Sequence, residues 1–202
     1  MSLQFPRFLR PLFGKSVQWN VQPSSKVIYL TFDDGPVPEV TPQVLDILDA
    51  YGWKATFFCV GDNVRKYPEV YQEVLRRGHQ TANHTFNHIK GFETPTDDYV
   101  RNVELAAQWI DSNLFRPPHG HITYKQIRAL KSNYRIIMWD VITHDYNRNF
   151  SPDQVFRNVE KYVRSGSIVV FHDSIKAQNN VLTVLPKALE FWIANGYQSG
   201  LL

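Results

Sequence analysis

Two adjacent carboxylates, Asp33 and Asp34, carry the strongest chemical signal in the sequence. They end an apolar run, 27–30, and are followed at once by Gly35-Pro36. The run is β-branched and aromatic in character, which predicts a buried strand that ends in a turn. Two like charges at one strand tip repel each other unless a cation or a shared proton relieves them. The pair therefore indicates a metal site.

Two histidines could supply further ligands. His84 and His88 are four residues apart, so on one helical turn both imidazoles would face the same way. With Asp34 they make a set of two histidines and one carboxylate that leaves positions open for water or substrate. Such a set suits catalytic zinc or another divalent first-row metal, such as cobalt or nickel. A His-x-x-x-His pair alone is weak evidence, and the carboxylate pair strengthens it.

Strand-like and helix-like stretches alternate from residue 26 onward. The predicted strands cover 27–30, 55–60, 79–83, 114–115, 135–141, 167–171 and a short tail within 197–202. The predicted helices cover 41–52, 68–78, 96–110, a stretch after 123, 151–166 and 182–194. Thr41-Pro42 is interpreted as an N-cap followed by proline at the first helical position. Thr123 with Gln126, and Ser151 with Gln154, are capping boxes that predict helix starts.

The candidate reactive residues share one position in this pattern. Each falls at or just beyond the C-terminal end of a predicted strand: Asp33 and Asp34, His84 and His88, Arg116, Asp145, and His172. Regular alternation predicts a parallel sheet covered by helices, and a (β/α) barrel brings all such strand ends to one face. An open sheet would use only a few strands at one switch point. We therefore predict a distorted or incomplete (β/α) TIM-like barrel of about seven strand–helix units.

Length and composition exclude several classes of protein. At 202 residues, 43% hydrophobic and 20% charged, the chain is globular and most simply one domain. The net charge of +3 is spread and not gathered into a stripe, so we expect no nucleic-acid partner. Cys59 is the single cysteine, which makes an intramolecular disulfide impossible. No stretch is long and apolar enough to span a membrane.

The first 25 residues are set apart from the barrel. Phe5, Phe8 and Phe13 lie among basic residues, but no continuous apolar segment of a secretory signal follows. We expect residues 1–25 to form an arm packed on the barrel, with a membrane-surface segment as the alternative, because Pro6 and Pro11 interrupt any helix. Residues 26–202 are expected to form a single catalytic domain. The compartment stays open between the cytoplasm and the membrane surface or cell envelope.

Four motifs give the chain a family resemblance. Residues 31–36 (TFDDGP), 84–88 (HTFNH), 116–120 (RPPHG) and 171–173 (FHD) occur in this order. The chain thereby resembles the polysaccharide deacetylases, the NodB-homology enzymes of carbohydrate esterase family 4. The resemblance covers nearly everything from Lys26 to the C-terminus, and the first two motifs match in full.

The resemblance implies a role for each matching residue on the metal side. Asp33 would be the general base, while Asp34, His84 and His88 would bind the metal. A water whose pKa the cation lowers would lose a proton to Asp33 and attack an acetamide carbonyl. Arg116 would keep Asp33 ionised and oriented through a charge-assisted hydrogen bond.

On the other side, the resemblance implies an acid and an oxyanion donor. His172 would protonate the departing amine, and Asp145 would tune the pKa of His172. The backbone N–H of His119, together with the metal, would hold the tetrahedral oxyanion. Taken alone, His172 or Arg116 could be a structural residue; their order in the motifs favours the functional interpretation.

Two motifs depart from the family pattern. His119 stands where the third motif usually has Tyr, which alters the cleft wall but not a backbone donor. The fourth motif usually reads Asp-x-x-Asp-Trp, and here Ile142 replaces its first Asp and Tyr146 its Trp. Tyr146, Trp139 and Phe86 are candidates for stacking on a sugar ring, with core packing as an equal alternative. We expect the side chains of the other histidines to be structural or at the rim: His79, His119, His121 and His144.

The predicted function is the metal-dependent removal of N-acetyl groups from an amino-sugar polymer or oligomer, peptidoglycan-like or chitin-like, by a monomer. One alternative keeps the chemistry and takes a small amide as the substrate of a C–N hydrolase. Another is a non-catalytic carbohydrate-binding relic. A pure binder has no use for a base, so the presence of Asp33 favours catalysis.

Overall fold

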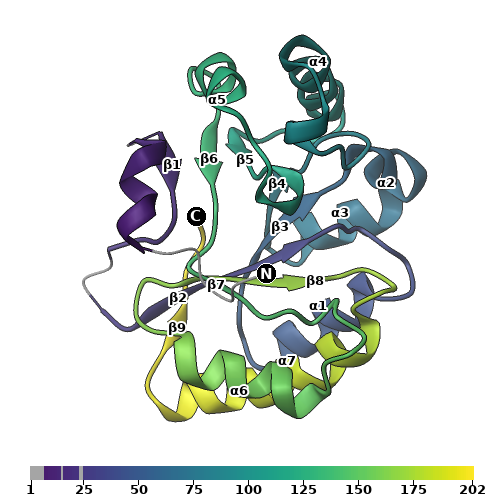
Figure 1. Cartoon of the computed structure of the whole chain (residues 1–202). Coiled ribbons are helices and arrows are strands. Elements are labelled where there is room, and N and C mark those ends of the chain that lie inside the picture. The colour runs from purple at the N-terminus through teal and green to yellow at the C-terminus, as the bar shows by residue number, and fades with distance from the viewer. Residues whose placement is uncertain (1–6, 15, 23–24) are drawn as a thin grey trace.

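The protein is described by a computed structural model that covers residues 7–14, 16–22 and 25–202. Its centre is a sheet with the strand order β1-β6-β5-β4-β3-β2-β8-β7, and β9 pairs with β2 (Figure 1). The strands are β1 (Val17–Gln18), β2 (Val27–Asp33), β3 (Thr56–Cys59), β4 (Gln80–Asn83), β5 (Leu114–Phe115), β6 (Arg135–Ile137), β7 (Val141–Ile142), β8 (Ile168–His172) and β9 (Gln198–Ser199). Neighbouring strands of the sheet are parallel throughout.

Helices follow most strands and cover the outside of the curled sheet. The α-helices are α1 (Thr41–Ala50), α2 (Gly61–Lys66), α3 (Pro68–Arg76), α4 (Thr96–Ala107), α5 (Tyr124–Leu130), α6 (Pro152–Tyr162) and α7 (Gln178–Ala194). The described residues also form three short 3-10 helices, η1 (Arg7–Phe13), η2 (Gly91–Glu93) and η3 (Pro118–Gly120). Figure 1 shows α6 and α7 side by side at the bottom and α5 at the opposite end. The predicted distorted (β/α) barrel is confirmed.

The central strands do not alternate between buried and exposed residues. Every residue of β3 and of β8 is buried, as expected for parallel strands covered on both faces. Phe32 stacks on Phe57 with ring centroids 4.9 Å apart. Both capping boxes predicted from the sequence are present at the starts of α5 and α6.

The predicted strand 135–141 is wrong in one respect, because it is two strands. The peptide N–H of Met138 donates to Gln18 in the β1 edge, whereas that of Asp140 donates to Ile168 of β8. Residues 138–140 therefore carry the chain from β6, the second strand in the sheet order, to β7, the last strand in that order. The sequence also gave no sign of α2, nor of the edge strand β1, which pairs with β6.

The described part of the first 25 residues contacts the barrel. The Arg10 guanidinium lies 2.9 Å from the carboxylate of Asp140, which is buried. Asp140 also forms an ion pair with Arg164. Phe13 packs edge-on against Trp19, with ring centroids 5.5 Å apart. Phe5 and Pro6, which entered the expectations for this segment, lie outside the described residues. No helix in the described ranges is long and apolar enough to cross a membrane.

Candidate active site

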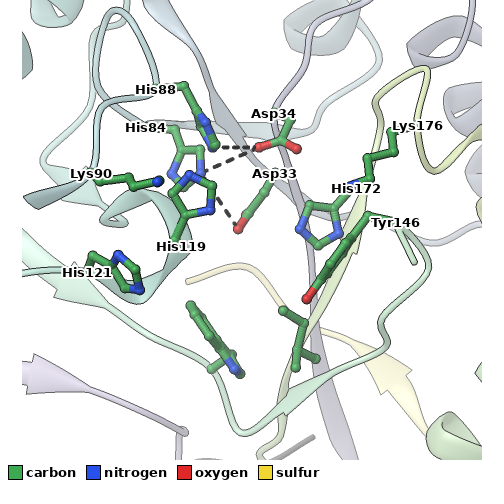
Figure 2. A pocket seen from close by; sticks show the side chains of 12 residues that line it. Asp33, Asp34, His84, His88, Lys90, His119, His121, Tyr146, His172 and Lys176 are labelled. Atoms are coloured by element: carbon green, nitrogen blue, oxygen red, sulfur yellow. Dashed lines mark ion pairs between the residues drawn. The ribbon is translucent and has the colours of Figure 1, made fainter. Parts of the chain in front are cut away.

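A cavity of about 400 Å³ opens at the C-terminal ends of the strands (Figure 2). It is lined by Asp33, Asp34, His84, His88, Lys90, His119, His121, Trp139, Ile142, Tyr146, His172 and Lys176. Eight of these are residues that the sequence predicted for the site. Arg116 and Asp145 are fully buried and lie behind the lining, where each contacts a residue that does face the cavity.

Asp33 is the last residue of β2 and is held by Arg116. Arg116 donates from Nη1 to Asp33 Oδ1 at 2.6 Å and to the Thr31 hydroxyl at 2.8 Å. The same guanidinium donates to the carbonyls of Ile137 and Met138. A guanidinium keeps its charge even when buried, so it fixes the Asp33 carboxylate and leaves Oδ2 on the cavity side, 3.9 Å from His84 Nε2.

Asp34 faces the two histidines. Its Oδ1 lies 3.0 Å from His88 Nε2 and 3.8 Å from His84 Nε2, as the dashed lines in Figure 2 mark. Burial disfavours the charged carboxylate, but the hydrogen bond from His88 and the positive charge of His172 outweigh this and hold the pKa of Asp34 below its ordinary value. The backbone of Asp34 has a φ of 82°, a costly conformation for a residue with a side chain.

His84 is held as a neutral imidazole. Its Nδ1 lies 2.7 Å from the carbonyl oxygen of Arg116, and since a carbonyl only accepts, Nδ1 carries the hydrogen. The lone pair is then on Nε2, which faces Asp34. Burial lowers the pKa of His84 to about 4, so the ring is uncharged at neutral pH.

The predicted helical turn through His84 and His88 is wrong. The segment is a loop after β4 in which Thr85 and His88 have φ angles of 63° and 55°. Side-chain amides hold this conformation: Asn83 accepts from the Thr85 N–H, and Asn102 of α4 accepts from the next two N–H groups. The two imidazoles meet through loop geometry, which a spacing of four does not reveal.

The ligand atoms of Asp34, His84 and His88 fit a divalent metal. They lie within 4.8 Å of one another, and tetrahedral ligands about 2.0–2.2 Å from zinc are roughly 3.3 Å apart. The separations of 3.0 and 3.8 Å bracket that value. One carboxylate and two imidazole nitrogens are also donors that such metals accept.

His172, on the opposite wall, has a different partner. Its Nδ1 lies 2.8 Å from Asp145 Oδ1, and its backbone N–H donates to Asp145 Oδ2 at 2.7 Å. Burial disfavours the charged ring, but the Asp145 carboxylate outweighs it, aided by Asp34 and Asp33, and raises the pKa of His172 to about 9. The imidazole is therefore protonated at neutral pH.

The remaining predicted residues divide between the cavity and the core. His119, in η3, has a φ of 59° and its ring lies 4.7 Å from that of His88. Tyr146 packs edge-on against His172 with ring centroids 4.8 Å apart, and Trp139 also lines the cavity. Phe86 does not line the cavity; it packs against the buried core, as its alternative interpretation expected.

Three residues near the carboxylate pair acquire contacts that the sequence did not suggest. Asp173 accepts from the Gly35 N–H at 3.1 Å and from the Thr41 hydroxyl at 2.7 Å. Thr41 is therefore not an N-cap; it is the first residue of α1, and its hydroxyl also accepts from Val37. A Cβ at Gly35 would lie 2.0 Å from the Asp173 carboxylate, so only glycine fits. Burial raises the pKa of Asp173 to about 7.

Lys90, His121, Ile142 and Lys176 complete the lining. The two lysines and His121 carry no motif signal, and only their place in loops after strands could have suggested them. Ile142 puts an apolar side chain at the position where the family motif has a carboxylate.

Comparisons with known proteins agree with this arrangement. Residues 20–135 match the sequence model of a family described as Polysaccharide deacetylase. A peptidoglycan-N-acetylglucosamine deacetylase of Bacillus cereus is 34% identical over 191 residues, which are 90% of this chain and 89% of that protein. A chitooligosaccharide deacetylase of a Bradyrhizobium species is 32% identical over 171 residues, 81% of this chain and 78% of its own length.

A solved structure extends the likeness to three dimensions. The crystal structure of a peptidoglycan N-acetylglucosamine deacetylase, in complex with an N-hydroxybenzamide compound, superposes with a TM-score of 0.86 at 28% identity. The superposed region covers 93% of this chain and 91% of the chain of that crystal structure. The chain belongs to the polysaccharide deacetylase family, the NodB-homology enzymes of carbohydrate esterase family 4. It is accordingly a hydrolase of carbon–nitrogen bonds other than peptide bonds.

Proposed function

We propose that the protein removes N-acetyl groups from an amino-sugar polymer or oligomer of the peptidoglycan or chitin type. The reaction joins water to the acetyl carbonyl carbon and breaks its bond to nitrogen, which leaves acetate and a free amine on the sugar. The observation that carries the proposal is the pair of opposed groups on the cavity walls: a fixed carboxylate, Asp33, and a protonated imidazole, His172.

Asp33 is assigned as the general base. Its Oδ1 is occupied by Arg116, so Oδ2 is the oxygen that takes the proton from the attacking water. That oxygen lies beside His84, and a base must stand within hydrogen-bond reach of the proton that it removes. Arg116 acts through Asp33, because its charge-assisted hydrogen bond orients the carboxylate and holds it in place.

Asp34, His84 and His88 are assigned as the ligands of one divalent metal, zinc by preference with cobalt or nickel as alternatives. When bound, such an ion polarises a carbonyl and makes a nearby water more acidic. The protein prepares the ligands for it, with His84 neutral and Asp34 ionised at neutral pH.

His172 is assigned as the general acid that delivers a proton to the departing nitrogen. Asp145 keeps the ring protonated and oriented. We assign the backbone N–H of His119 as a donor to the oxyanion. Trp139 and Tyr146 give the cavity apolar surfaces on which a sugar ring can lie.

The test is acetate release, with metal content measured on the same sample. N-acetylglucosamine oligomers, peptidoglycan fragments and small amides are compared as substrates. Turnover of the polymeric sugars above the small amides supports the proposal, whereas turnover of the amides alone replaces its substrate class. Binding of the sugars without acetate release by metal-loaded protein would establish a non-catalytic binder.

A further inference from the structure

Helix α2 begins between the two loops that carry the proposed metal ligands. The peptide N–H of Gly61 donates to the Thr85 carbonyl at 2.9 Å, and that of Asp62 donates to the Phe86 carbonyl at 3.0 Å. Both carbonyls lie in the loop between the two proposed histidine ligands. The first N–H groups of a helix have no partner within the helix, so the start of α2 can bond this loop without losing a helical bond.

The third residue of α2 contacts the loop of the carboxylate ligand. The side chain of Asn63 donates from Nδ2 to the Asp34 carbonyl at 2.8 Å. The peptide groups of Asn63 are used elsewhere, because its N–H donates to the Val60 carbonyl and its carbonyl accepts from the Tyr67 N–H. The bond to Asp34 is therefore a property of the asparagine side chain and is lost with it.

Asp34 needs this support because its backbone is strained. Its φ of 82° is costly for a residue with a side chain and persists only where the surroundings fix it. The peptide groups on either side are held, since the Asp33 carbonyl accepts from the Asp173 N–H and the Gly35 carbonyl accepts from the Val60 N–H. The bond from Asn63 falls between these two, on the strained residue itself.

Close packing keeps the start of α2 in one place relative to the histidine loop. A Cβ at Gly61 would lie 2.7 Å from the Phe86 ring and 3.0 Å from the Cα of Ala106 in α4. The helix start thus lies directly against the loop that it bonds. A side chain that extends from this turn to Asp34 therefore transmits the position of the histidine loop to the carboxylate.

We propose that the first turn of α2, residues 61–63, fixes the separation between the two ligand loops, and that Asn63 is a positioning residue for metal binding by Asp34. The inference rests on the ligand assignment of the proposed function. Asn63 acts through the backbone of Asp34, whose Oδ1 lies 3.0 Å from His88 Nε2 and 3.8 Å from His84 Nε2 (Figure 2). Partners that orient a metal ligand contribute about 10- to 100-fold to metal affinity.

The test is the zinc affinity of the metal-free protein, measured at neutral pH by competition with a chromophoric chelator. Asn63→Ala and Asn63→Leu both remove the donor, both introduce a residue that favours a helix, and the leucine keeps the side-chain volume. Each variant is expected to bind zinc about 10-fold more weakly than the wild type. Asn179→Leu, at an exposed asparagine in the first turn of α7, should leave the affinity unchanged.

Urea unfolding of the same metal-free proteins separates positioning from stability. A residue that only stabilises α2 would lower the unfolding midpoint and leave the zinc affinity of the folded protein unchanged, and that result would overturn the inference. An equal loss of affinity in Asn179→Leu would overturn it as well. If the alanine variant does not fold, the leucine variant decides the outcome.

The wild-type measurement separates this inference from the proposed function. If wild-type protein binds no zinc, the ligand assignment of the proposed function fails and the inference falls with it. If the wild type binds zinc and the Asn63 variants bind it equally tightly, the inference alone falls.

Discussion

The two walls of the active site each contain a buried histidine, and the two histidines are in opposite states. His84 places Nδ1 against a backbone carbonyl, and burial lowers its pKa to about 4. His172 places Nδ1 against the Asp145 carboxylate, which outweighs burial and raises its pKa to about 9. The partner of one ring nitrogen thus decides whether a buried imidazole is neutral or charged at neutral pH.

The strongest way to break this comparison is to remove the neutral ring. His84→Ala is expected to lose stoichiometric metal and to lower kcat/KM by about 10⁴-fold, since the charge of a metal is worth several kcal/mol in the transition state. Metal content by mass spectrometry and acetate release are measured together. His121→Ala, also in the cavity lining, should retain the metal. A His84→Ala protein that keeps full metal occupancy would contradict the ligand assignment.

Removing the charged ring should leave the metal in place. His172→Gln is expected to lower kcat by about 10³-fold, within the usual range for a general acid, with metal content unchanged. Asp33→Asn on the opposite wall should behave in the same way, because the base is not a ligand. Retention of wild-type kcat in either variant would reject the role of that residue.

Changing only the partner of the charged ring sharpens the comparison further. In Asp145→Asn the carboxylate that outweighs burial is lost, so the pKa of His172 should fall from about 9 toward or below its ordinary value. Because the acid must be protonated, the alkaline limb of the kcat profile should move to lower pH, with kcat at neutral pH down by about 10-fold. Asp153→Asn, an exposed carboxylate, serves as the matched control. An unmoved alkaline limb would show that Asp145 only positions the ring.

The same shift has a consequence for folding. The folded pKa of His172 lies above its unfolded value, so its contribution to stability is complete below about 6.5 and is lost as the pH rises through about 9. The unfolding free energy of the metal-free wild type, measured in urea, should fall across this window. The Asp145→Asn protein should show a flatter profile, and equal slopes in the two proteins would contradict the linkage.

The smallest expected effect concerns the hydrogen bonds of Asp173, which connect the two walls of the site. Asp173 follows His172 on one wall and holds Gly35, beside the carboxylate pair, on the other. Thr41→Val removes the hydroxyl that donates to Asp173 and accepts from Val37, at an expected cost of about 1–3 kcal/mol in unfolding free energy. Thr183→Val, whose exposed hydroxyl bonds within α7, should cost less than about 0.5 kcal/mol. Equal losses in the two variants would show that the contact contributes nothing.

The sequence was sufficient where local pattern and strand ends decide the outcome. Apolar runs with reactive residues just beyond them predicted the sheet, its parallel sense and the face on which Asp33, His84 and His172 meet. The capping boxes at Thr123 and Ser151 fixed helix starts because their side chains act within one turn. The motif order carried the role assignments that the geometry now supports as proposals.

Long-range contacts account for what the sequence could not predict. Thr41 has the residue type of an N-cap, yet its hydroxyl bonds a carboxylate 132 positions away. The division of 135–141 into β6 and β7 depends on which edge each half pairs with, and the loop of His84 and His88 depends on Asn102 from α4. Each of these partners is too distant in the sequence to be predicted from the residues around the position itself.

The sheet order also determines when the site can form as the chain is made. In the register of β2 with β8, Asp33 lies opposite His172. The proposed base and acid therefore become neighbours only when β8, which is far from β2 in the sequence, pairs with β2. A nascent chain that ends before β8 already contains the three proposed ligands and the base, but not the acid. Contacts of such high sequence separation form late in folding. The proposed metal ligands and the proposed acid are therefore completed at different stages of synthesis, and the acid is the last of these groups to join the site.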